Sequence, residues 1–321
     1  MKSNKWILLT GVLAFAGGVA NVLINMRLDI YGLFRDTHGR HLGVIDNERR
    51  TKFLLSERYV PENFDSVLIG SSVSNNWNTG AIQNFHVYNE SIDGGNISEE
   101  KLLVEKVLRK RPLKLAICVV HPFMTDTHGI NSGDMTDKEY WGALGSTTLF
   151  RAYAKLLRSR GSAQLWDEYG TEEYDGPVKL NSVLHKMFDP GSDFHIDPDA
   201  LTDYRALISE LRKQGTRVVV VVPPTSEELL EPKREALARY LEQVMGLFSP
   251  QDEAIDFNAR EYDAFLRDNQ NFRDGIHLSR QGAAKVVAIL DQHLQRSSGV
   301  VLSTVESLSV GFKSRTIRGT E

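Results

Sequence analysis

Cysteine is almost absent from this 321-residue sequence, which contains Cys118 alone. One cysteine cannot form an internal disulfide, so an oxidising compartment is neither required nor excluded. Cys118 lies inside the apolar run 115–120, and we interpret it as a small buried hydrophobic side chain rather than a reactive thiol. An excess of positive charge is also lacking. The formal net charge is -4, which gives no reason to expect nucleic-acid binding.

What the sequence does have is the composition of a globular protein. Hydrophobic residues make up 41% and charged residues 25%, which is enough to build a real core. The length exceeds one typical domain, although α/β domains of about 200 to 250 residues are ordinary. We find no internal repeat.

Charged side chains are missing from residues 6–26, directly after Lys2 and Lys5. A helix of that length can cross the hydrocarbon core of a membrane, which is about 30 Å thick. A cleaved signal peptide is the alternative, since Ala14-Phe15-Ala16 offers a small-residue cleavage pattern. Apolar character continues beyond that point, and we therefore favour an uncleaved signal anchor over residues 1–26. Both interpretations place the bulk of the chain outside the cytoplasm, and the first makes it a single-pass membrane protein.

The stretch 27–63 is polar and mixed, and we interpret it as a solvated juxtamembrane linker. His38 and His41 lie in it without a carboxylate or cysteine at a diagnostic metal-ligand spacing. The sequence thus predicts no metal site. Residues 64–296 form the predicted folded domain, and residues 297–321 a loosely ordered tail.

Within the domain, short apolar strands alternate with helical patterns, as in parallel βαβ units. Runs such as Val218–Val222 are apolar on both faces, as strands covered on either side require. The predicted strands are 66–69, 86–89, 115–120, 217–222 and 254–257. The predicted helices are 98–111, 199–214, 226–248, 259–268 and 280–295, with Ser98 and Ser279 as N-caps.

Residues 123–198 interrupt this alternation, because they are rich in Gly, Asp, Tyr and Trp. We interpret them as an insertion between the third and fourth strands that walls or caps the site. Exposed aromatic side chains there would suit carbohydrate stacking, whereas buried packing is the more common role of tryptophan.

A candidate nucleophile follows the first predicted strand. The run Val67-Leu68-Ile69 ends in Gly70-Ser71-Ser72, and a polar stretch that can open a helix comes next. Ligands of doubly wound sheets bind beyond the carboxyl ends of strands, so Ser72 is well placed. A helix N-terminus also offers N–H groups to a developing oxyanion. A serine that merely caps a helix is the other interpretation, and Ser71 and Ser74 are weaker candidates.

The segment Asp274-Gly275-Ile276-His277 lies just ahead of the last predicted helix. Its carboxylate is close enough in sequence to orient the imidazole, whose second nitrogen can then take a proton from a serine. A solvated loop with an incidental histidine is the alternative. With Ser72, the segment supplies a serine, an imidazole and a carboxylate, the groups of nucleophilic acyl chemistry.

The order of these blocks resembles the SGNH/GDSL hydrolase superfamily. Gly70-Ser71-Ser72 matches its first block with serine in place of aspartate, and Asp274 and His277 match its last. The resemblance covers roughly residues 65–295. It implies a three-layer flavodoxin-like parallel sheet, with Ser72 as the nucleophile. It also implies an oxyanion hole from Ser72 and Gly94, with Gly95 as the alternate.

The third block of that family departs here, because Val120-His121-Pro122-Phe123 lacks the Gly-x-Asn-Asp pattern. Either His121 takes the place of the third oxyanion donor or the family's asparagine is absent. In this departure and in its N-terminal anchor, the chain is similar to membrane-anchored members of the superfamily that act in cell-envelope acyl transfer. These include DltD-type and alginate-acetylation-type proteins. That branch implies a domain outside the membrane beside a membrane-bound O-acyltransferase.

The sequence therefore predicts a membrane-anchored serine esterase or O-acyltransferase. Its expected partner molecule is an acylated envelope glycan or an acyl donor, and acetyl is expected by resemblance only. No cofactor is expected. Water and a sugar hydroxyl compete for the acyl-enzyme, and the sequence does not decide between hydrolysis and transfer. The alternative is a non-catalytic glycan-binding or assembly component that keeps the fold, which the missing third block and the aromatic insertion would explain.

Overall fold

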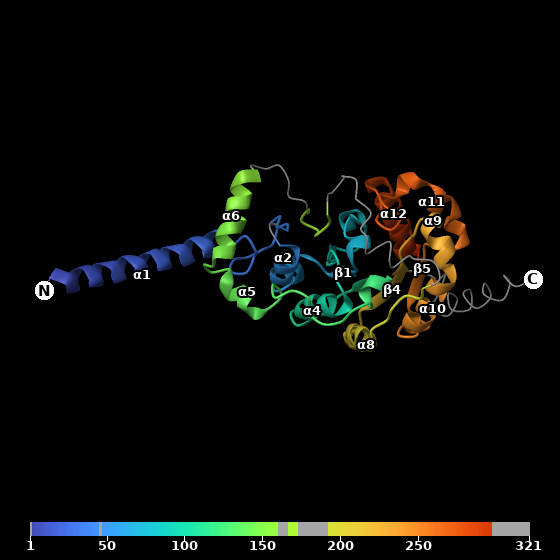
Figure 1. Ribbon diagram of the computed structural model, residues 1–321, viewed down its shortest axis with the longest axis horizontal. Coiled ribbons are helices and arrows are strands. Elements are labelled where there is room, and N and C mark those ends of the chain that lie inside the picture. Colours follow the sequence, from blue (N-terminus) through green and yellow to red (C-terminus); the bar gives the residue numbers. More distant parts are fainter. Residues whose placement is uncertain (1, 45–46, 160–165, 173–191, 297–321) are drawn as a thin grey trace, which may run out of the picture.

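A five-stranded parallel sheet forms the centre of the computed structural model, which describes residues 2–44, 47–159, 166–172 and 192–296 (Figure 1). The strands are β1 (Ser66–Ile69), β2 (Val87–Asn89), β3 (Leu115–Val119), β4 (Arg217–Val222) and β5 (Glu253–Asp256). Their order across the sheet is β2-β1-β3-β4-β5, which is the flavodoxin-like order. The predicted α/β class and parallel sheet are confirmed.

The sheet is covered on both faces. Every residue of β1, β2, β3 and β5 is buried, and so is all of β4 after Arg217. Since successive side chains of a strand point to opposite faces, burial of all of them requires a layer on each side. Because both faces of these strands are buried, their sequences are apolar at consecutive positions. Ser66 of β1 pairs with Val87 on one side and Leu115 on the other, so the carboxyl ends lie at one edge.

Helices alternate with the strands as the sequence pattern predicts. Helices α4 (Ile97–Leu108) and α8 (Pro198–Lys213) pack against each other, and α12 (Arg280–Arg296) contacts the short turn η2 (Thr79–Ala81). The helices of this part are α4 (Ile97–Leu108), α8 (Pro198–Lys213), α9 (Glu227–Leu230), α10 (Arg234–Met245), α11 (Asp263–Arg267) and α12 (Arg280–Arg296). The 3-10 turns are η1 (Ser72–Ser74), η2 (Thr79–Ala81), η3 (Pro122–Met124), η4 (Glu231–Lys233), η5 (Arg260–Tyr262) and η6 (Asn269–Asn271).

Two details of the predicted helices are corrected. The predicted helix 226–248 is divided into α9, η4 and α10, because Pro232 in η4 has no N–H to donate to a continuous helix. The N-cap of α4 is Asn96 rather than Ser98. The Asn96 side chain accepts hydrogen bonds from the N–H groups of Ser98 and Glu99, so the helix begins two residues earlier.

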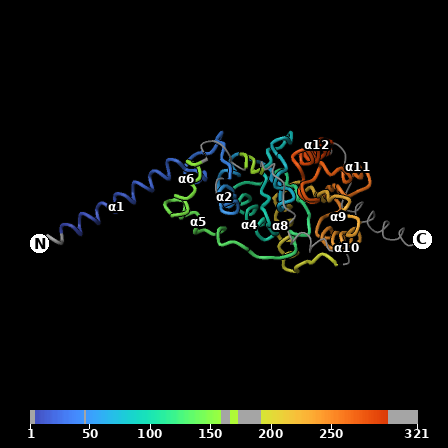
Figure 2. The backbone as a smooth tube through the Cα atoms, turned by 45° about the horizontal axis from the view of Figure 1, so that its top comes forward, coloured from blue at the N-terminus to red at the C-terminus, as the bar shows by residue number. Residues whose placement is uncertain are grey.

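Helix α1 (Lys2–Leu28) projects from the domain as a single rod in both views (Figures 1 and 2). Its stretch Lys5–Leu28 has a mean hydropathy of 2.2 and is long and apolar enough to cross a membrane. Large apolar side chains such as Trp6 and Phe15 are exposed along it. In its last turn, however, the side chain of Asn25 is buried, so the helix ends against the folded domain.

The predicted solvated linker 27–63 is wrong for both of its halves. In the first half, Tyr31 and Leu33 are buried in a cluster with Phe53 and Leu54. The second half is helical. Helices α2 (Glu48–Leu55) and α3 (Tyr59–Asn63) lie there, and Phe53, Leu54, Leu55 and Tyr59 belong to the buried core. The charged residues that make this segment look solvated in the sequence are largely paired in the structure. Arg50, for example, contacts Asp134 and Glu139 of the insertion. Residues 47–63 are therefore part of the folded domain.

The described part of the insertion contains α5 (Asp137–Gly142), α6 (Thr147–Ser159) and a turn at residues 166–172. That turn packs against the carboxyl end of β2, where the Asn89 N–H donates to the Tyr169 carbonyl at 2.8 Å. The Glu172 N–H donates to the Asn75 carbonyl at 2.9 Å, one residue beyond η1. The insertion thus reaches the edge of the sheet where the sequence places the site. Residues 160–165 and 173–191 of the insertion, and the predicted tail, lie outside the described residues.

Candidate active site

Ser72 stands at the carboxyl end of β1 and begins the turn η1. Strand β1 lies beside β3, and the order of the sheet reverses between these two strands. Ligands of doubly wound sheets bind at such a switch point. Ser71 forms a parallel bridge with Ile92, which extends the β1–β2 pairing up to the residue before Ser72. The half-buried Ser72 side chain is therefore held at a fixed edge of the sheet.

The structure brings the three predicted side chains together. His277 Nε2 lies 2.9 Å from Ser72 Oγ, and His277 Nδ1 lies 2.7 Å from Asp274 Oδ2. Both distances are within hydrogen-bonding range, although Ser72 and His277 are 205 residues apart. Of the alternate serines, Ser74 hydrogen-bonds to the Ser91 hydroxyl, and Ser71 Oγ is buried without a partner among the described residues. The hydroxyl that contacts the imidazole is that of Ser72.

A tight loop holds Asp274 and His277. The Arg273 N–H donates to the His277 carbonyl at 2.8 Å, which closes the loop on itself. Its tip is fixed from outside by the Ser226 N–H, which donates to the Gly275 carbonyl at 2.7 Å. Gly275 has φ +92°, and a Cβ there would lie 2.5 Å from Leu229 Cδ1. Glycine tolerates this backbone conformation and has no Cβ to collide with Leu229, which explains why position 275 is a glycine.

The Asp274 carboxylate is arranged to stay ionised. Its side chain is fully buried, which by itself raises the pKa of a carboxyl group. The hydrogen bond with the His277 ring and those from the N–H groups of Ile276 and His277 outweigh burial, and they hold the pKa of Asp274 below its ordinary value. A carboxylate in this position fixes the imidazole with its proton on Nδ1 and leaves Nε2 to accept from Ser72.

One further hydrogen bond joins the two distant segments. The Asn76 side-chain amide, four residues after Ser72, donates to the Leu278 carbonyl at 2.7 Å. The contact ties the polar stretch after η1 to the end of the histidine loop. It helps to explain how two blocks so far apart in the sequence keep their spacing.

Of the two glycines predicted for the oxyanion site, Gly94 is the better placed. It has φ +59°, which favours glycine, and it follows the Ile92 that bridges to Ser71. Within the described part of the chain, the N–H of Gly94 has no acceptor. The Gly95 N–H, in contrast, donates to the Ile92 carbonyl at 2.9 Å. Its donor is occupied in closing the turn, which argues against Gly95 as the alternate.

His121 is buried at the carboxyl end of β3 and is 3% exposed. Burial, together with a smaller effect of the nearby His277, lowers the pKa of His121 to about 3, so the ring is neutral near pH 7. Its Nδ1 accepts a hydrogen bond from the Phe123 N–H at 3.4 Å, which leaves the proton on Nε2. Nε2 is buried and has no partner among the described residues. The third block of the sequence thus supplies a neutral N–H donor close to His277.

Helix α2 contributes contacts that the sequence did not predict. Arg49 Nη2 donates to the Gly94 carbonyl at 3.0 Å, and the same guanidinium forms a two-pronged pair with the fully buried Glu99. Glu48 accepts a hydrogen bond from the Asp93 N–H at 2.9 Å. The fully buried Lys52 lies beneath the turn and donates to the Ser91 carbonyl. The turn 92–95 is therefore held by charged side chains of one helix.

Glu90 is a second buried acid near Lys52, and its ionisation should affect the stability of the fold. Burial raises the pKa of Glu90 to about 7, whereas Lys52 and the Ser56 hydroxyl favour its ionised form less strongly. The folded protein thus holds this proton more tightly than the unfolded chain, whose carboxyl has the ordinary value of 4.5. The resulting stability is fully present below pH 4.5 and is lost as the pH rises through about 7.

Replacing Glu90 with glutamine should therefore change the pH dependence of stability. Glutamine keeps an acceptor for the Ser56 hydroxyl and cannot ionise, so Glu90→Gln should gain stability relative to wild type between pH 5 and pH 8 by at most about 3 kcal/mol. Thermal unfolding of both proteins across this range measures the difference. A difference that does not vary with pH would show that Glu90 keeps the same charge in both states.

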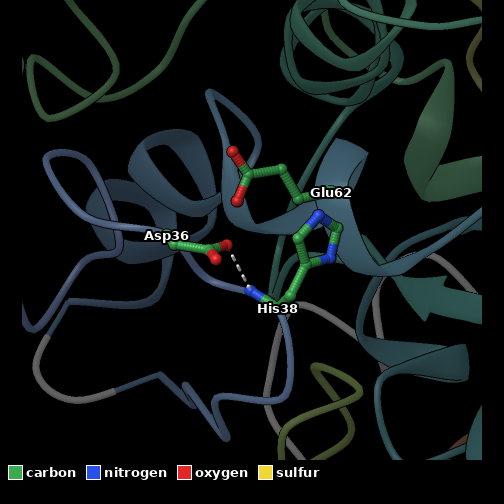
Figure 3. Close-up of side chains that lie close together, drawn as sticks. All are labelled: Asp36, His38 and Glu62. Atoms are coloured by element: carbon green, nitrogen blue, oxygen red, sulfur yellow. Dashed lines mark hydrogen bonds between the residues drawn. The ribbon is translucent and has the colours of Figure 1, made fainter.

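Two clusters of potential metal ligands lie elsewhere in the described part of the chain, and their carboxylates already make internal contacts. Asp36, His38 and Glu62 lie together in Figure 3, where the His38 N–H donates to Asp36 Oδ1 at 3.1 Å. The Glu62 carboxylate pairs with Arg58 and accepts from Thr37. In the second cluster, His128 hydrogen-bonds to Asp197, the N-cap of α8. Both arrangements are explained as a turn and a helix cap, and we assign no metal to them.

Comparisons with known proteins add little to this geometry. No family model matches the sequence, and no curated protein matches it. Among solved structures that match is one described provisionally as a platelet activating factor from Streptococcus pneumonia. The match has 10% identity and a TM-score of 0.40, and it covers 76% of this chain and 91% of that chain. A likeness at this level supports no inference about function, which must come from the site.

Proposed function

We propose that this protein is a membrane-anchored serine esterase or O-acyltransferase in which Ser72 is the nucleophile. The single observation that carries the proposal is the continuous hydrogen-bonded chain from Asp274 through His277 to Ser72. A serine hydroxyl needs such an oriented base to become nucleophilic at neutral pH. The arrangement supports acyl chemistry with water or a sugar hydroxyl as the final acceptor of the acyl group.

The reaction would proceed in two steps, acylation of Ser72 and then deacylation. Ser72 Oγ attacks the ester carbonyl carbon while His277 Nε2 takes the hydroxyl proton, and the carbonyl oxygen becomes an oxyanion. The intermediate collapses to acyl-Ser72, and the leaving alcohol receives the proton from His277. A water or sugar hydroxyl then attacks acyl-Ser72, gives its proton to His277, and releases an acid or a new ester. Ser72 regains its proton in this last step.

Three donors are proposed for the oxyanion. The N–H groups of Ser72 and Gly94 come from neighbouring strand ends, and the Nε2–H of His121 comes from the end of β3. The neutral state of His121 supports this role, because the ring can donate a hydrogen bond without introducing a positive charge beside His277. Fixed donors of this kind lower the barrier because they need no reorganisation when the negative charge forms.

The finer identity rests on sequence resemblance. We propose that the chain is an SGNH/GDSL-like protein of the membrane-anchored branch, with its domain on the extracytoplasmic side. An acylated envelope polysaccharide or an acyl donor would be the substrate, acetyl the acyl group, and a membrane-bound O-acyltransferase the partner. Helix α1 supports the anchor by its length and hydropathy.

The second candidate is a non-catalytic glycan-binding or assembly protein with the same fold. The absence of the Gly-x-Asn-Asp pattern after β3 favours it, since a family block for oxyanion binding is changed. The two candidates differ in one measurable property, which is the reactivity of the Ser72 hydroxyl.

A serine-directed fluorophosphonate separates the two. The full-length protein in detergent should be labelled stoichiometrically at Ser72, and Ser72→Ala should abolish labelling. Ser71→Ala is the matched control, because the Ser71 hydroxyl is buried without a partner among the described residues and its loss should leave labelling intact. A folded wild-type protein that stays unlabelled would support the non-catalytic candidate.

Arg49 is proposed as a positioning residue for the Gly94 turn. Lysine in its place keeps a charge near Glu99 but cannot contact Glu99 in two places and the Gly94 carbonyl at once. Arg49→Lys should lower kcat for ester hydrolysis about 10- to 100-fold with little change in KM, because the oxyanion donor moves. Arg50→Lys is the control, since Arg50 lies on the same helix but pairs with Asp134 and Glu139. Equal kcat values for Arg49→Lys and Arg50→Lys would show that Arg49 does not position the Gly94 turn for catalysis.

A further inference from the structure

Helix α6 lies across the end of α1, and the two are joined by hydrogen bonds. The Asn25 side chain donates to the Leu144 carbonyl at 2.8 Å, just before α6. The Tyr153 hydroxyl of α6 donates to Asn25 Oδ1 at 2.9 Å. Both views show α6 beside the domain end of the α1 rod and running across its axis (Figures 1 and 2). The position of α6 relative to the apolar span is thus fixed by direct contacts.

One side of α6 packs on the domain, and a second apolar side remains uncovered. Leu149 and Ala152 are buried, whereas Phe150 is 54% and Leu157 is 77% exposed. Phe150 and Leu157 are seven residues apart, about two helical turns, so they lie on the same flank. Trp141 of the adjacent helix α5 is 68% exposed as well. Large apolar side chains are therefore concentrated beside the end of the span.

The charge of α6 has one sign. Arg151, Lys155 and Arg158 are exposed, and the sequence 147–159 contains no acidic residue. In the described part of the chain, none of the three pairs with a carboxylate. A helix with exposed aromatic and leucine side chains and a purely basic polar side has the composition of a helix that lies in a membrane interface.

We propose that α6 and Trp141 form a second membrane contact, in which α6 lies in the headgroup region of the bilayer that α1 spans. Phe150, Leu157 and Trp141 enter the boundary between headgroups and acyl chains, and the basic side chains meet anionic headgroup phosphates. The lipid surface is the occupant that the structure favours, because Asn25 and Tyr153 hold α6 at the point where the span ends. This contact fixes the orientation of the domain on the membrane and does not depend on the chemistry of Ser72.

Site-specific spin labels in the full-length protein test the proposal. Cys118 is fully buried, so a cysteine introduced at the surface can be labelled selectively. Leu157→Cys reports on α6, and Gln243→Cys on α10 is the control at an exposed position of the domain. In lipid nanodiscs with anionic lipid, the label at Leu157 should collide several-fold less with a water-soluble nickel complex than the label at Gln243, while it remains accessible to oxygen.

Two outcomes would overturn the proposal. A Leu157 label as accessible to nickel as the Gln243 label would mean that α6 faces water. A label shielded from both nickel and oxygen would mean that protein, rather than lipid, covers it. The charge is tested by replacing Arg151, Lys155 and Arg158 with glutamine. Protection at Leu157 should then be weaker and should no longer differ between anionic and zwitterionic discs, with fluorophosphonate labelling of Ser72 as a separate readout of the site.

Discussion

Replacing Ser72 with alanine is expected to lower kcat/KM for ester hydrolysis by about 10⁴- to 10⁶-fold. Alanine removes the atom that forms the acyl bond, and no other described hydroxyl contacts the imidazole. His277→Ala should have an effect of the same size, because the Ser72 hydroxyl then has no base. Kinetics with p-nitrophenyl acetate on the full-length protein, together with the thermal midpoint of each variant, measure both effects.

The double variant distinguishes a shared mechanism from two separate losses. Residues that act as one unit are not additive, so Ser72→Ala combined with His277→Ala should be no slower than either single variant. Ser71→Ala should retain wild-type activity. Full activity in a folded Ser72→Ala or His277→Ala protein would contradict the mechanism.

Asp274→Asn is expected to lower kcat by about 10⁴-fold while it leaves the site nearly unchanged in shape. The carboxylate accepts a hydrogen bond from His277 Nδ1 at 2.7 Å and thus keeps Nε2 free to accept from Ser72. An asparagine amide can donate to the ring instead, and the tautomer with the proton on Nε2 cannot deprotonate the serine. Comparison with Asp263→Asn, an acid on α11 outside the site, controls for the loss of charge.

The pH dependence gives this prediction a second readout. Activity needs the ionised form of Asp274, and the hydrogen bonds from His277 and Ile276 hold the pKa of Asp274 below its ordinary value of 3.8. The orienting carboxylate should thus be lost only as the pH falls below the usual carboxyl range. An Asp274→Asn variant with wild-type kcat near pH 7 would exclude the orienting role.

The sheet and the proximity of Ser72 to the Asp274–His277 loop follow from local sequence signals. Parallel strands buried on both faces must be apolar throughout, so runs such as Val218–Val222 mark them directly. Once the strands are known, the carboxyl edge of the sheet is known, and a serine after β1 and a histidine before the last helix can be expected there. The resemblance assigned Gly94 and raised His121 as a donor, but only the structure shows that the Gly95 N–H is occupied.

The contributions of α2 could not be predicted in the same way. A run such as Glu48-Arg49-Arg50 is normally solvated, and its partners here lie about 45 to 90 residues away. Burial of Lys52 and Glu99 is possible only because each meets a specific polar partner in the folded chain. Glu62 likewise reaches Asp36 and His38 only through the fold, so the spacing of residues in the sequence could not predict this cluster.

Mass spectrometry of the acyl-enzyme is the most direct measurement of the proposed chemistry. The full-length protein is incubated with an activated acetyl ester, quenched in acid and digested. Acetyl should be found on the Ser72 hydroxyl in wild type and should be absent in Ser72→Ala. Ester hydrolysis that proceeds with no acyl group on Ser72, or with the group on another residue, would contradict Ser72 as the nucleophile.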